Sequence, residues 1–301
     1  MPRTLTAWAA GVWLAGAVHA GAVGEGTGPL PTKTEMSDLI VLDLYPHLDH
    51  AHVGSLLQVT RGDGVAGQPH FEDSQRVLFS WTKGETSGVY VFDVMEEEVS
   101  LFIEAPRGAY SPKVIPGGGG ISVLKVAEEG MGQHLYRFPR EESQGIRLLP
   151  EVPDIESYAW AGERSIAFRR ESQPSRLFLG DLETGEILHV QDHVGGNLQE
   201  VPGESAVSFV DRSDPEQWFV RRVDGTTGET TSLVDTPPGS EHHAWMSAQT
   251  LVMGYEGILY RFTAGQSTQW TPLVDLRAYV GDFAWFAVSP SGLRIALLVQ
   301  P

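Results

Sequence analysis

The stretch FAVSPSGLRIALLV, from Phe286 to Val299, is the clearest copy of a phrase that recurs along the chain. A short strand-like segment leads into a Ser-Pro-Ser-Gly turn, and a strongly apolar segment follows. Between their turns the copies lie 40 to 46 residues apart, and a regular period of this length is typical of a repeat architecture. The five earlier copies are QPHFEDSQRVLFSW from Gln68, SPKVIPGGGGISVLKV from Ser111, SYAWAGERSIAF from Ser157, NLQEVPGESAVSFV from Asn197 and HHAWMSAQTLVMGY from His242.

A second phrase follows each of the first five copies, and in it apolar and polar residues alternate up to a hairpin. Alternation with a period of two indicates a strand with one buried face. A shorter apolar stretch comes after each hairpin, so every period contains four short strands, the unit of a β-propeller blade. The second phrases are GVYVFDV from Gly88, HLYRFPR from His134, RLFLGDLETGE from Arg176, WFVRRVDGTTGE from Trp218 and GILYRFTAG from Gly257.

The last copy ends at Pro301 with only its two inner strands. The missing pair stands at the front of the chain, where SDLIVLDL from Ser37 resembles the second phrase and SLLQVT from Ser55 resembles an outer strand. Closing the ring in this way leaves no exposed sheet edge. The sequence therefore predicts an all-β fold: one domain, residues 37–301, forming a six-bladed β-propeller of four-stranded blades. Its last blade is closed by the N-terminal strands.

These repeats resemble the propeller repeats of the TolB family, in which a Ser-Pro-Asp-Gly turn and an apolar strand precede Asp-Ile-Tyr-aliphatic-aliphatic-Asp. SDLIVLDL (Ser37–Leu44) and VSPSGLRIALLV (Val288–Val299) carry the resemblance, which covers residues 37 to 301, the propeller domain only. Some turns depart from the pattern, such as Glu72-Asp73-Ser74-Gln75. The resemblance implies an exported six-bladed propeller, and it implies no catalytic residue.

The N-terminus is typical of a secretory signal peptide. A basic start containing Arg3 precedes an apolar run from Leu5 to Val18, and Val18-His19-Ala20 offers small residues for cleavage. We therefore expect a signal peptide at residues 1–20, cleaved after Ala20, and a flexible Gly- and Pro-rich leader at 21–36. The expected location is periplasmic or secreted, with no membrane insertion after cleavage.

The composition excludes several classes of protein. Lys and Arg number 21 against 39 Asp and Glu, a formal charge of −18 that disfavours nucleic acid and favours a basic partner. The chain has no Cys, which excludes disulfides and thiol chemistry. It also lacks the G-x-S-x-G and H-E-x-x-H motifs of common hydrolases. The 34 Gly and 19 Pro fit a turn-rich propeller, which we expect to be a monomer.

Ligands of propellers usually lie at one mouth of the central channel, where the inner strands begin. Because adjacent strand residues point to opposite faces, at most one of His242 and His243 faces the channel. Trp160 and Trp245 are expected to pack between blades instead. The repeat alignment places ten candidate ligand-binding residues at the mouth, namely Gln68, His70, Tyr110, Ser111, Tyr158, Asn197, Gln199, His242, His243 and Trp285.

Two functions remain open from these residues. The first is a non-enzymatic binding or scaffold protein for a protein, peptide or small ligand, with a cell-envelope protein or peptide as partner and no cofactor. The second is a metal-dependent hydrolase or lyase, since His and carboxylate side chains suit Zn, Mn or Fe. Its divalent-metal ligands on the axis would be His70, Glu156, Glu241 and His243.

Overall fold

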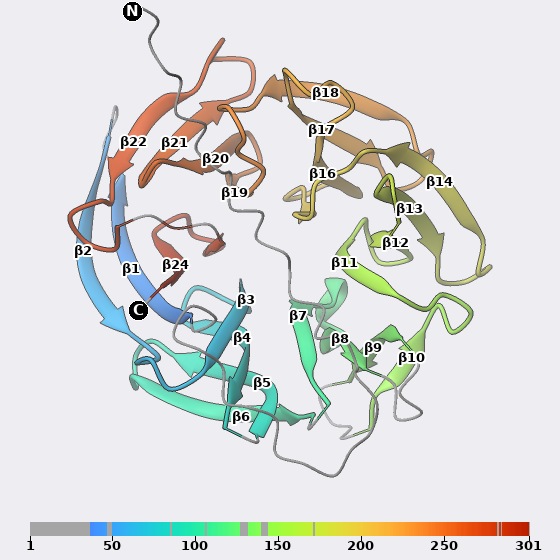
Figure 1. The fold of residues 1–301 in the computed structure, drawn as a ribbon, viewed down its shortest axis with the longest axis horizontal. Coiled ribbons are helices and arrows are strands. Elements are labelled where there is room, and N and C mark those ends of the chain that lie inside the picture. Colours follow the sequence, from blue (N-terminus) through green and yellow to red (C-terminus); the bar gives the residue numbers. More distant parts are fainter. Residues whose placement is uncertain are drawn as a thin grey trace, which may run out of the picture.

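The computed structural model describes residues 37–46, 50–84, 86–105, 107–126, 132–139, 144–170, 172–281, 283 and 285–300. In it six antiparallel four-stranded sheets form a ring around a central axis (Figure 1), which confirms the predicted all-β propeller. Within the described ranges the only helical element is a short 3-10 turn at Pro116–Gly118. No helix in these ranges is long and apolar enough to cross a membrane. The expected signal peptide and leader lie outside the described residues.

Five blades use four consecutive strands each, and the first strand of each is the innermost. Blade 1 contains β3 (Val65–Phe71), β4 (Arg76–Lys83), β5 (Thr86–Asp93) and β6 (Glu98–Glu104). Blade 2 contains β7 (Ala109–Val114), β8 (Ile121–Val126), β9 (Gln133–Phe138) and β10 (Ile146–Leu148). Blade 3 contains β11 (Ile155–Trp160), β12 (Ser165–Arg170), β13 (Arg176–Asp181) and β14 (Ile187–Asp192).

The remaining blades complete the ring. Blade 4 contains β15 (Gln199–Glu200), β16 (Ala206–Asp211), β17 (Phe219–Asp224) and β18 (Thr230–Asp235). Blade 5 contains β19 (His243–Ser247), β20 (Thr250–Tyr255), β21 (Ile258–Thr263) and β22 (Thr271–Asp275). Blade 6 combines β23 (Phe286–Val288) and β24 (Arg294–Val299) with β1 (Asp38–Pro46) and β2 (Ala51–Gln58), in the order β2-β1-β24-β23. The N-terminal strands therefore close the last blade as predicted.

Burial explains the apolar second segment of each repeat. Residues Val77–Trp81 of β4 and Ala206–Val210 of β16 are buried throughout, because each second strand has a strand on either side and a neighbouring blade on each face. In outer strands such as β14 and β18 half of the residues are exposed, and Val234 is the one buried residue in these two strands. The first strand of each blade lies nearest the axis, where the cavities lie.

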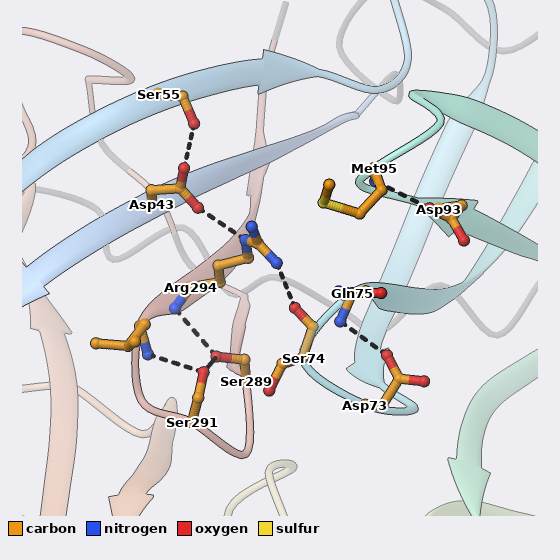
Figure 2. Close-up of polar contacts among 11 residues, drawn as sticks. Asp43, Ser55, Asp73, Ser74, Gln75, Asp93, Met95, Ser289, Ser291 and Arg294 are labelled. Carbon is orange, nitrogen blue, oxygen red and sulfur yellow. Dashed lines mark hydrogen bonds and ion pairs between the residues drawn. The ribbon is translucent and has the colours of Figure 1, made fainter.

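A polar cluster fastens the closing blade (Figure 2). On β24, Arg294 donates from Nε to Asp43 Oδ1 of β1 at 2.7 Å and from Nη1 to the Ser74 carbonyl of blade 1 at 2.5 Å. Ser55 of β2 donates a short hydrogen bond to Asp43 Oδ2. One guanidinium therefore joins both ends of the chain to the first blade.

Candidate functional site

Two cavities open along the propeller axis, one toward each mouth. The first, called here the strand-start cavity, has a volume of about 850 Å³ and lies where the inner strands begin. The second, the turn-side cavity, has a volume of about 1220 Å³ and lies beside the turns that follow the inner strands. His70, Lys113 and Gln199 line both, so the cavities meet at a waist formed by these side chains.

The structure brings most of the predicted ligand-binding residues to the strand-start cavity. Its lining includes Gln68, His70, Ser111, Tyr158, Asn197, Gln199, His242 and Trp285. Tyr110 is not part of this lining and packs instead against the apolar core between blades 2 and 3. His243 is fully buried, whereas His242 lines the cavity, so only one of this pair faces the channel, as the strand geometry predicts. That these residues bind a ligand stays a prediction.

Several of these polar side chains connect neighbouring blades. Gln68 of blade 1 accepts a hydrogen bond from the Ser111 amide of blade 2 at 2.9 Å, and both residues have a positive φ. Tyr158 of blade 3 donates to the Ser111 carbonyl at 3.0 Å. Asn197 of blade 4 donates to the His243 carbonyl of blade 5 at 2.7 Å. These atoms are therefore committed to holding blades together, a role that spacing along the sequence does not reveal.

The predicted packing of the two tryptophans between blades is confirmed. Trp160 is buried and donates from Nε1 to Ser122 Oγ of the preceding blade at 2.9 Å. Trp245 makes the equivalent bond to Ser208 Oγ, also at 2.9 Å. Their indole N–H groups therefore do not serve a ligand, although both rings line the turn-side cavity.

Aromatic rings and ion pairs form the wall of the strand-start cavity. The rings of His242 and Trp285 lie 4.3 Å apart between centroids, and the buried His242 Nδ1 has no hydrogen-bond partner in the described part of the chain. Arg212 pairs with Glu241 at 3.1 Å, and its guanidinium also lies 5.6 Å from the Trp218 ring.

A second ion pair continues the same wall. Arg169 pairs with Glu156, and both side chains are largely buried. Gly196 lies between the two pairs, since a Cβ there would stand 3.7 Å from Arg169 Nη2 and 3.8 Å from Glu241 Oε1. The wall therefore offers alternating positive and negative charge beside an aromatic surface.

Burial determines the charge of the histidines. Burial, together with the positive charge of Lys113, lowers the pKa of His70 to about 3. Burial lowers the pKa of His243 to about 4 and also lowers that of His242, where the charge of Glu241 opposes the shift. All three imidazoles are therefore neutral at pH 7.

The four predicted metal ligands are not gathered into one coordinating group. Among the described residues no set of three or more His, Asp or Glu side chains could hold a metal ion. His70, Glu156 and Glu241 line the strand-start cavity, but each carboxylate is paired with an arginine. The His243 Nε2 atom lies 2.8 Å from Ser208 Oγ inside the blade interface. Whether these four residues bind a divalent metal therefore stays a prediction.

Sequence reasoning missed the charged residues that matter most in these cavities: Lys113, Arg169, Glu200 and Arg212. Lys113 had a usable signal, because Ser111-Pro112-Lys113 stands in blade 2 where Gln68-Pro69-His70 stands in blade 1, each at a bulge in the inner strand. Arg169 lies near the end of a second strand. Because the two strands are antiparallel, the second strand ends at the mouth where the first strand begins, and Arg169 pairs with Ser157 there.

No protein-family model and no curated protein matches the chain. Among solved structures, a putative TolB from Agrobacterium tumefaciens matches with a TM-score of 0.60 at 13% identity, covering 88% of this chain and 98% of that one. TolB from Acinetobacter baumannii matches with a TM-score of 0.56 at 13% identity, covering 87% and 64%. The fold is a TolB-type propeller. At such low identity the likeness concerns the fold alone.

The same fold also occurs in an enzyme. An oligogalacturonate lyase, solved in complex with manganese, matches with a TM-score of 0.50 at 13% identity and covers 84% of this chain and 83% of its own. A TolB-type fold therefore does not decide between binding and catalysis, and the side chains in the cavities must do so.

Proposed function

We propose that this protein is a non-enzymatic binding protein that holds a peptide segment of a cell-envelope partner in the strand-start cavity. The supporting observation is the cavity itself, about 850 Å³ on the axis, with the His242–Trp285 ring pair beside two Glu–Arg pairs. Concave sites of this size that combine aromatic walls with convergent polar groups are typical of ligand binding. Both carboxylates are held by arginines, which favours recognition over acid–base chemistry.

Charge favours a basic partner. The formal charge of −18 attracts cationic segments and speeds their encounter with the mouth. Raising the ionic strength should therefore slow association more than it speeds dissociation. No contact with nucleic acid is expected, for the same reason.

Affinity capture from an envelope extract tests the proposal. We expect immobilised protein to enrich a discrete partner, and Trp285→Ala to lose it because the aromatic wall is removed. Tyr279→Ala serves as the control, since Tyr279 is an exposed aromatic residue outside both cavity linings. Equal capture by the wild-type protein and Trp285→Ala, or no enrichment at all, would contradict the proposed site.

The metal-dependent hydrolase or lyase is the alternative, and the manganese-bound lyase of similar fold is what motivates it. It requires His70, Glu156, Glu241 and His243 to converge, which the pairing of both glutamates with arginines does not favour. Elemental analysis of purified protein, with thermal melting after adding Mn²⁺ or Zn²⁺, separates the two proposals. A stoichiometric metal together with a raised melting temperature would favour the enzyme.

Export belongs to the same proposal. The basic start, apolar run and small residues of positions 1–20 support cleavage after Ala20 and a periplasmic or secreted, monomeric product. N-terminal sequencing of the protein from an envelope fraction should begin at Gly21, and size-exclusion chromatography with light scattering reports the oligomeric state. A retained Met1 would overturn the export proposal.

A further inference from the structure

Two opposite charges face the turn-side cavity without touching each other. Lys113 is on β7 of blade 2 and Glu200 is on β15 of blade 4, and both line this cavity. Between them stands β11 of blade 3, which supplies Tyr158 and Trp160 (Figure 1 places β7 and β11 side by side at the axis). Lys113 and Glu200 therefore lie on either side of the same aromatic strand.

The Lys113 ammonium has no carboxylate partner. Within the described part of the chain no carboxylate oxygen comes within 4.0 Å of its Nζ, which lies 6.0 Å from the centroid of the Tyr158 ring. Burial lowers the pKa of Lys113, and the negative charge of Glu200 partly opposes this. His70 lines the cavity beside Lys113 and is neutral, so it carries no negative charge that could balance the Lys113 ammonium.

Glu200 is the matching unpaired anion. Its Oε1 accepts one hydrogen bond, from the Trp160 amide at 3.3 Å, and no cationic nitrogen of the described residues lies within 4.0 Å of it. Burial raises its pKa, and the charge of Lys113 opposes the shift. By contrast, two charged residues at the rim of the same cavity are paired, Arg164 with Glu183 and Glu204 with Arg222.

Lys113 and Glu200 are half-buried, and charges that are partly withdrawn from water are normally paired, because losing hydration without a partner is costly. Here the pair is held apart across a cavity, so a molecule that carries both charges can satisfy both at once. We propose that the turn-side cavity binds a zwitterion of the α-amino-acid type, with its carboxylate at Lys113 Nζ and its ammonium at the Glu200 carboxylate. The indole faces of Trp160 and Trp245 then offer an apolar wall for the ligand's side chain. This site lies toward the opposite mouth from the strand-start cavity and shares Lys113 with it, since Lys113 lines both cavities.

Isothermal titration calorimetry tests this site with each common L-α-amino acid, and with the matching primary amine and carboxylic acid. For phenylalanine the matched compounds are phenethylamine and 3-phenylpropanoate. We expect at least one amino acid to bind at least about tenfold more tightly than both of its analogues, because each lost charge removes one charge-assisted contact. If no amino acid is preferred over its amine and acid, the proposal is wrong.

Variants assign the two contacts. Lys113→Met should remove the preference for the amino acid over its amine, and Glu200→Gln should remove the preference over its acid. Arg164→Met is the matched control on the rim, and Trp285→Ala the control in the other cavity, and both should leave the affinity unchanged. Circular dichroism and thermal melting establish that each variant is folded, and Lys113→Gln replaces the Met variant if that one is not. Unchanged selectivity in a folded Lys113 variant would overturn the assignment.

Discussion

Ser122 and Ser208 are buried serines that each join two aromatic side chains of the next blade. Trp160 Nε1 donates to Ser122 Oγ at 2.9 Å, and the Tyr158 hydroxyl, which donates to the Ser111 carbonyl, lies 2.9 Å from the same Oγ and can accept its proton. Ser208 Oγ lies 2.8 Å from His243 Nε2 and accepts from Trp245 Nε1 at 2.9 Å. The two repeats Tyr-Ala-Trp and His-Ala-Trp therefore share one purpose, which is to bond the inner strand of one blade to the second strand of the preceding blade.

Replacing Ser208 by alanine should destabilise the fold. The change leaves the buried Trp245 N–H and the His243 ring nitrogen without a partner, and an unsatisfied buried group costs about 1–3 kcal/mol. We expect the free energy of unfolding in urea to fall by about that amount. Ser232→Ala is the control, because Ser232 is exposed on β18 of the same blade. Equal stability of the two variants would show that the Ser208 hydrogen bonds contribute little to the free energy of unfolding.

The buried histidines predict a dependence of stability on pH. The pKa of folded His243 is lowered to about 4 by burial, whereas an unfolded histidine has a pKa of about 6.5. The unfolded chain therefore binds more protons between these values. The contribution of His243 is fully present above pH 6.5 and is lost as the pH falls toward 4, at about 1.4 kcal/mol per pH unit.

Urea unfolding of the wild-type protein and of His243→Gln at intervals between pH 4 and 7 measures this effect. The stability of the variant should vary less steeply with pH over this window than that of the wild-type protein. Parallel curves would mean that folded His243 titrates near its ordinary value.

At the residue scale the sequence predicted positions better than roles. Eight of the ten candidate residues line the strand-start cavity, because the repeat alignment correctly locates the beginning of each inner strand. It could not reveal that Gln68, Tyr158 and Asn197 use their polar atoms between blades, since these bonds join residues 43 to 47 positions apart. Lys113 could have been found from its alignment with His70, whereas the lack of an ion-pair partner for Lys113 and Glu200 is visible only in three dimensions.

At the scale of elements, the closing strands β1 and β24 are joined by side-chain contacts in addition to their backbone hydrogen bonds. The Arg294 guanidinium binds both Asp43 and the Ser74 carbonyl (Figure 2), and its charge together with the Ser55 hydroxyl lowers the pKa of Asp43 against the effect of burial. At the other end of β1, Asp38 accepts hydrogen bonds from Thr60 Oγ1 at 2.9 Å and the Gly62 amide at 2.7 Å. Both ends of β1 therefore carry a carboxylate with several donors.

Replacing Arg294 by methionine should weaken this closure. The Arg294 and Asp43 side chains are only 22% and 21% exposed, so losing the charge-assisted bonds should cost about 1–3 kcal/mol of unfolding free energy. Arg277→Met is the control, since the Arg277–Asp275 pair is 61% and 51% exposed and exposed pairs contribute little. Thermal melting and urea titration measure both variants. A loss for Arg277→Met as large as that for Arg294→Met would contradict a special role for the closing cluster.

At the scale of the whole molecule, the regular period was enough to predict six blades and the split sixth one. Each period contains one strongly apolar second strand, and that strand is the part of a blade most completely buried, as Val77–Trp81 illustrates. The pairing of β1 with β24 followed because the last copy lacks its outer strands. The cavities were harder to predict, because their walls combine inner strands with the returning ends of second strands, such as Arg169, and with the segment 172–175.

Ring closure makes a prediction about the complete molecule. In β1, Leu39, Val41, Leu42 and Leu44 are essentially inaccessible to solvent, and the strand separates β2 from β24. Burial of each such side chain contributes about 1.5–3 kcal/mol, so the four together rival the whole net stability of about 5–15 kcal/mol of a typical protein. Removing residues 1–46 should therefore abolish the folded monomer and expose the edge of β24 to pairing between chains.

A chain shortened only by residues 1–20 is the matched control and should behave as the full-length protein does. Size-exclusion chromatography and urea unfolding distinguish the two outcomes: aggregates or an unfolded profile for the longer deletion, and a cooperative monomer for the shorter. If the chain without residues 1–46 stays monomeric and unfolds at the same urea concentration as the control, the N-terminal strands are an addition to a ring that is stable without them. The burial of β1 between two strands, with a carboxylate anchored at each end, leads us to expect the opposite.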